Sequence, residues 1–150
     1  MVLRSCSASL LVLLMILCAG CGSGEKVPPL VAVEGVVLDQ AGQPLDIVSV
    51  MFLPDPEQEN FGQPSIGQTD ENGKFVLFYD GDKNRPGAAI GKNRVILKDV
   101  KAIRTSRDKD PMPRRFHKKY VTASTTDLSF NIAEGDGQSF EIKVDDSDNK

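Results

Sequence analysis

The feature that most constrains the fold of this chain is a series of short segments in which apolar and polar residues alternate. These segments recur at intervals of roughly 10 to 20 residues between Leu30 and Val144, with turn residues between them. Alternation with a period of two is typical of a strand with one buried face and not of a helix. The sequence therefore predicts an all-β domain.

Seven segments carry this pattern, and each places its apolar side chains on one face. They are residues 30–38, 46–53, 65–69, 74–79, 93–100, 128–132 and 140–144. Asn72-Gly73 before the alternating run of 74–79 is a strong signal for a tight hairpin turn. Pro54 should end the second strand, because proline cannot donate to a sheet ladder. We expect about seven strands.

The N-terminus has the character of an export signal. One basic residue, Arg4, precedes an apolar run from Leu10 to Leu17. That run is too short to span a bilayer, which needs about 20 apolar residues, so it indicates the core of a signal peptide. The stretch that follows, residues 17–21 (Leu-Cys-Ala-Gly-Cys), resembles the lipobox of bacterial lipoprotein precursors. An ordinary secretory peptide, cut after Ala19 or Gly20, is the alternative.

The lipobox resemblance implies that Cys21 becomes the acylated first residue of the mature protein. We then expect a signal peptide at 1–20, the lipidated Cys21 and a tether at 21–30, a domain at 31–144 and an acidic tail at 145–150. The other two cysteines, Cys6 and Cys18, would leave with the signal peptide, so the domain would contain no internal disulfide. The expected location is the cell envelope, anchored by lipid on the periplasmic side of a membrane or at the cell surface.

Four pieces of the domain resemble the carboxypeptidase regulatory-like, or transthyretin-like, β-sandwich found in many short bacterial lipoproteins. Residues 33–54 are similar to its opening hairpin, and 69–75 to its central turn. Residues 87–97 are similar to a small-residue turn that enters the next strand, and 119–128 to the segment before the last two strands. Together the pieces extend over about residues 31–144.

The resemblance implies a Greek-key β-sandwich with an accessory or binding role. It implies no peptidase activity, because in carboxypeptidases this domain is a non-catalytic appendage. One departure is Asn93, where the family usually has an aromatic residue. We expect Phe116 or another side chain to fill that space.

Candidate catalytic and metal-binding groups are sparse. The single histidine, His117, stands in a charged stretch without the spacing of a zinc site or a Ser/His/Asp relay, and we expect an exposed loop histidine. Residues 80–84 imitate the start of a calcium loop, but Arg85 stands where that loop needs glycine. We therefore predict no cofactor, no metal and no enzymatic activity. A hydrolase with an unrecognised site and a purely mechanical spacer are the alternatives.

The charge distribution is uneven. Lys92 to Lys119 holds eleven basic and three acidic residues, although the whole chain has a net charge of −3. Residues 101–119 also contain two prolines and lack clean periodicity, so we expect a long loop, where binding function often lies. The candidate anion-binding residues are Arg104, Arg107, Arg114, Arg115, Lys118 and Lys119.

Such a loop would bind an anionic partner, which we expect to be an acidic envelope polysaccharide, lipid head groups or an envelope protein. The membrane would be a second partner through the lipid anchor. The acidic net charge of the chain disfavours nucleic acid. A solvated loop without a ligand is the alternative.

Overall fold

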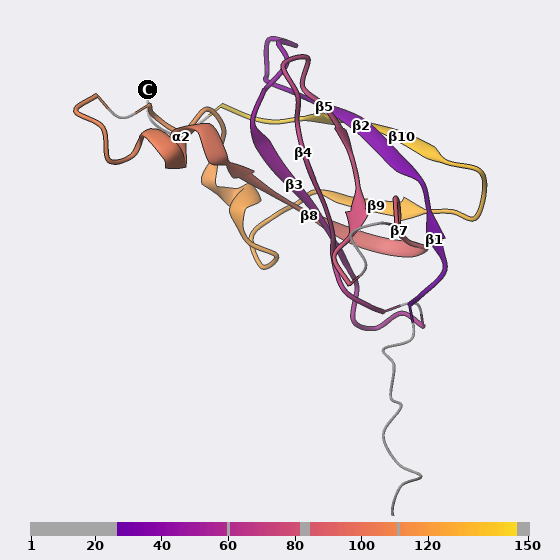
Figure 1. Ribbon diagram of the computed structural model, residues 1–150. Coiled ribbons are helices and arrows are strands. Elements are labelled where there is room, and N and C mark those ends of the chain that lie inside the picture. The colour runs from indigo at the N-terminus through magenta and orange to yellow at the C-terminus, as the bar shows by residue number, and fades with distance from the viewer. Residues whose placement is uncertain (1–26, 60, 82–84, 111, 147–150) are drawn as a thin grey trace, which may run out of the picture.

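The computed structural model describes residues 27–59, 61–81, 85–110 and 112–146 (Figure 1). The expected signal peptide, Cys21 and most of the tether lie outside these residues. So do positions 82–84 of the calcium-like stretch and the last four residues of the expected acidic tail.

The described chain is built mainly of strands, which confirms the all-β class. The strands are β1 (Leu30–Val31), β2 (Val33–Leu38), β3 (Val48–Pro54), β4 (Ser65–Gln68), β5 (Lys74–Val76), β6 (Phe78–Tyr79), β7 (Ala88–Ala89), β8 (Gly91–Asp99), β9 (Ser129–Ile132) and β10 (Gln138–Lys143). A short helix, α2 (Val100–Thr105), and a 3₁₀ helix, η2 (Lys118–Val121), follow β8.

Two main sheets organise these strands. One has five strands in the order β6-β4-β3-β8-β9, and all of its pairs are antiparallel. The other has the order β10-β2-β5, in which β10 runs parallel to β2. A third, two-stranded pairing joins β1 to β7. Long-range pairing therefore brings the last strand of the described chain beside one of its first (Figure 1).

Each of the seven segments expected to be strands contains strand structure, but two of them are each divided into two strands. Segment 30–38 forms β1 and β2. Segment 74–79 forms β5, which pairs with β2, and β6, which pairs with β4 in the other sheet. The predicted turn before it is present, because the Gly73 N–H donates to the Asp70 carbonyl at 3.0 Å and Gly73 has a φ of +72°. The chain thus passes between sheets at Leu77, and the hairpin partner of β4 is β6, not β5.

One hydrophobic core lies between the two main sheets. Phe52 of β3 has its ring centroid 6.5 Å from that of Phe75 of β5 and 5.9 Å from that of Phe140 of β10. Val50 and Leu97 from the five-stranded sheet are fully buried in the same cluster. The inward-facing apolar residues predicted from alternation are buried or packed against this core.

Asn93 is part of the buried side of β8 and is fully buried. Its Nδ2 group donates to the carbonyls of Ala89 and Gly91, each at 2.9 Å. Phe116 does not fill the space there, because it follows Arg115, which bonds Asp99 at the other end of β8. The expectation that Phe116 substitutes for an aromatic at this position was therefore wrong. The amide nitrogen of Asn93 is thus satisfied by backbone carbonyls just before and at the start of β8, whereas its buried Oδ1 has no hydrogen-bond partner among the described residues.

Candidate functional site

The basic segment, residues 101–119, lies beyond the Asp99 end of β8, away from the end of the domain that holds β1 (Figure 1). It was expected to be a long loop, but α2 and η2 give it regular structure at both ends. The physical reason is a set of contacts over long sequence distances. Asp99 caps α2 by accepting from the Ala102 N–H at 3.2 Å, and the buried rings of Phe116 and Tyr120 attach η2 to the core.

A buried carboxylate holds the segment in place. Asp99 is 3% exposed and receives both the Nη2 and Nε groups of Arg115, at 2.7 and 3.1 Å, as well as the Arg115 backbone N–H at 3.0 Å. The third guanidinium nitrogen of Arg115, Nη1, donates to Asp46 at 2.7 Å. Lys101 bonds the other oxygen of Asp46 at 2.8 Å. The four side chains form one ion-pair network between the segment, β8 and the loop before β3.

The network changes the ionisation of its members. Burial by itself would raise the pKa of Asp99, but the hydrogen bonds from Arg115 and Ala102 outweigh it and lower that pKa below the usual value. The bond from Lys101, followed by that from Arg115, lowers the pKa of Asp46. Burial lowers the pKa of Arg115, and the bonds to Asp99 and Asp46 raise it overall. Asp46, Asp99 and Arg115 are therefore charged at neutral pH.

Acid is expected to destabilise the domain through these carboxylates. Their folded-state pKa values lie below the unfolded value near 3.8, so their contribution is complete above about pH 5 and is lost as the pH falls through the folded-state values. Urea denaturation of residues 27–150 at pH 7 and pH 3 should show a lower midpoint at pH 3. Asp99→Asn should reduce that difference. An unchanged difference in this variant would contradict the account.

A second cluster fixes η2. Lys119 pairs with Asp127 at 2.8 Å and with Asp145 at 2.6 Å, and the Tyr120 hydroxyl donates to Asp145 at 2.9 Å. The bonds from Lys119 and then Tyr120 lower the pKa of Asp145. Asp145 is the first residue of the expected acidic tail, and it is bonded to the domain. The reason is the cationic and hydroxyl donors that η2 places beside it.

His117 lies at the start of the same 3₁₀ helix, η2, and its side chain bonds to that helix. Its Nδ1 atom accepts from the Lys119 backbone N–H at 2.9 Å, which caps η2. The side chain is half-buried, so the expected exposed loop histidine was wrong.

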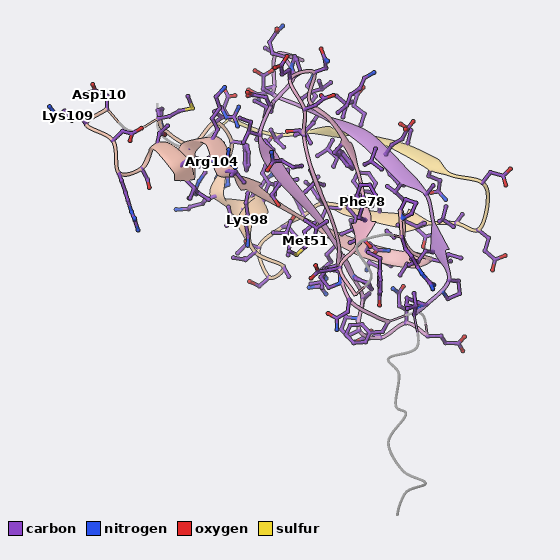
Figure 2. The ribbon with its side chains drawn as sticks, viewed as in Figure 1. Met51, Phe78, Lys98, Arg104, Lys109 and Asp110 are labelled. Carbon is purple, nitrogen blue, oxygen red and sulfur yellow. The ribbon has the colours of Figure 1, made fainter. Side chains whose placement is uncertain are left out.

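The structure separates the predicted anion-binding residues into two groups. Arg115 and Lys119 are bonded internally to carboxylates, so they are neutralised and hold the fold. Arg104, Arg107, Arg114 and Lys118 are exposed and form no ion pair with any described residue. Lys98 and Lys109 were not among the predicted anion-binding residues. They too are exposed and form no ion pair with any described residue. Figure 2 shows Arg104 on α2, with Lys109 at the tip of the loop beyond it.

A pocket of about 500 Å³ opens among these cations. It lies against α2 and the end of β8, and its lining includes Lys98, Asp99, Ala102, Ile103, Met112, Arg114 and Val121. Ile103 is 60% exposed there. Sequence reasoning missed this pocket, because no periodic signal in residues 101–119 marked a helix. A larger groove, of about 920 Å³, lies elsewhere, over β2, β4 and β5.

Two further observations concern chemistry and membranes. Within the described ranges, no group of three or more His, Cys, Asp or Glu side chains is placed to hold a metal ion. None of the helices among the described residues is long and apolar enough to cross a membrane.

Comparisons with known proteins place this chain in no family. No protein-family model matches it, and no curated protein matches it. A catechol 1,2-dioxygenase from Acinetobacter sp. ADP1, solved with bound mercury as inhibitor, is a similar solved structure at 15% identity and a TM-score of 0.39. The match includes 85% of this chain and 57% of the dioxygenase chain, so this protein spans little more than half of that structure.

Proposed function

We propose that this chain is a lipid-anchored protein of the cell envelope whose non-catalytic domain binds an anionic partner. The observation that carries the proposal is a set of exposed cations around α2 that form no ion pair with any residue the structure describes: Lys98, Arg104, Arg107, Lys109, Arg114 and Lys118. The neighbouring cations Arg115 and Lys119 already have carboxylate partners, so the fold itself uses only part of the basic segment. The remaining charges are available to a ligand.

A fixed arrangement of these charges favours binding over simple solvation. Asp99 and Arg115 hold the start and the later part of the segment to one another, and Phe116 anchors it in the core. Cations on a held segment lose less conformational entropy when they meet an anion than cations on a free loop.

The proposed architecture is the Greek-key β-sandwich of carboxypeptidase regulatory-like domains. Two sheets around one core, with a chain segment that passes from one sheet to the other at Leu77, support it. The same resemblance motivates a binding role in place of an enzymatic one.

Co-sedimentation of residues 27–150 with isolated envelope fractions tests the binding role, because this piece contains the whole described core but no lipid. Binding is expected at about 0.02 M salt and is expected to be lost by about 0.3 M, where screening is strong. Polysaccharide, extracted lipid and protein fractions offered separately distinguish the three kinds of anionic partner. Absence of binding at every salt concentration would contradict the proposal and would favour a spacer.

The lipid anchor has a separate test. Cys21→Ser is expected to abolish incorporation of labelled palmitate into the full chain, because it removes the thiol that the acyl group requires. Cys6→Ser is the matched control and should retain full labelling, since Cys6 lies outside residues 17–21 and is expected to leave with the signal peptide. Labelling that persists in Cys21→Ser would contradict the anchor.

A further inference from the structure

We propose that the pocket beside α2 binds an amphiphilic anion, an aliphatic chain that ends in a carboxylate. This inference rests on the proposed function, and it specifies the kind of anion that the basic segment recognises.

The first reason is the apolar character of the pocket. Ile103, at 60% exposure, is the most exposed of the four large apolar side chains that lie at the surface in the described part of the chain. It lines the pocket with Ala102, Met112 and Val121. Exposure of this apolar surface to water costs free energy, and a purely ionic ligand would leave the surface exposed. An aliphatic chain would remove it from water.

The second reason is the charge at the rim. Lys98 and Arg114 line the same pocket, are exposed and have no ion-pair partner among the described residues. The one carboxylate in the lining, Asp99, is already bonded by Arg115 and by two backbone N–H groups. The pocket therefore presents uncompensated positive charge next to its apolar wall. Lysine and arginine form charge-assisted bonds to carboxylates.

The third reason is size and construction. A volume of about 500 Å³ falls within the range of small-molecule sites. Two walls come from α2 and β8, and Asp99 at the end of β8 caps α2 and bonds Arg115. A polysaccharide or another polyanion would be bound by the outlying cations Arg107 and Lys109. It would make no apolar contact with Ile103. A combination of cations and exposed apolar groups matches an amphiphile better.

Methionine methyl NMR provides a direct test, because Met112 lines the pocket and Met51 does not. The full chain would be labelled at its methionine methyl groups, placed in phosphatidylcholine nanodiscs and titrated with octanoate. We expect a saturable shift of the Met112 signal with little change at Met51, whose position on β3 is shown in Figure 2. Hexanoate, butanoate and acetate should bind progressively more weakly, by roughly threefold or more for each two methylenes removed.

Two pocket variants, one control variant and two control ligands complete the test. Ile103→Ser should remove most of the dependence of affinity on the length of the carboxylate's aliphatic chain. Arg114→Gln should weaken octanoate binding by at least about threefold. Lys143→Gln, at an exposed position on β10 outside the pocket lining, should leave it unchanged. Octanol and octyltrimethylammonium, which lack the anion, should shift Met112 far less than octanoate.

The possible results separate this inference from the proposed function. Acetate and octanoate of equal affinity, octanol as effective as octanoate, or no shift at Met112 would each overturn the inference. If residues 27–150 still bound envelope fractions in a salt-sensitive way, the proposed function would stand without it. Loss of that envelope binding at every salt concentration would instead overturn the proposed function itself.

Discussion

Asp99→Asn is expected to destabilise the domain by about 2 to 4 kcal/mol, because it removes the charge that Arg115 bonds inside the protein. Asp99 is 3% exposed, and the side chain of Arg115 is 19% exposed. The change therefore leaves a partly buried guanidinium without its strongest partner, and it weakens the cap of α2. The partial exposure of Arg115 keeps the expected loss below that of a fully buried pair.

Urea denaturation of residues 27–150 at pH 7 measures this loss. Asp110→Asn, at the exposed tip of the loop that Figure 2 shows, is the matched control and should change the free energy of unfolding by less than about 0.5 kcal/mol. Equal stability of the two variants would show that the Asp99 network does not hold the basic segment.

Phe52→Ala is expected to cost about 3 to 5 kcal/mol, the usual loss for a fully buried aromatic residue. Phe52 lies between the sheets, with its ring centroid 5.9 Å from those of both Phe130 and Phe140. Its removal leaves a cavity that neighbours from both sheets line, and strands held by cross-strand hydrogen bonds cannot close it fully.

Phe61→Ala is the control for the Phe52 prediction, because Phe61 is the same residue type at 55% exposure. Thermal unfolding should show a large drop in midpoint for Phe52→Ala and almost none for Phe61→Ala. Comparable drops would mean that the core is not centred between the two sheets.

Alternation in the sequence predicted the core well, for a physical reason. Val48, Val50 and Phe52 recur every second residue, and a strand places such residues on one face whichever strand lies beside it. The same fact explains what could not be predicted. Residues 74–79 alternate in one unbroken pattern, so the pattern does not reveal that β5 and β6 belong to different sheets.

The candidate site depended on contacts that sequence spacing does not encode. Asp46 and Arg115 are 69 positions apart, and only the folded sheets bring them within 2.7 Å of each other. Residue types alone therefore made Arg115 and Arg114 look equivalent, although one is bonded internally and the other is exposed. The exposed Ile103 was likewise unpredictable, because α2 depends on the Asp99 cap and on packing at Ala102.

The central claim is that the exposed cations around α2 recognise an anionic partner, and two double variants of residues 27–150 test it most directly. Arg104→Gln with Arg114→Gln removes two positive charges from the proposed surface. Lys74→Gln with Lys143→Gln removes two from exposed positions on β5 and β10. In co-sedimentation with envelope fractions, the first pair should bind several-fold more weakly and with a flatter salt dependence, and the second should bind like the parent. Equal binding by both would contradict the claim.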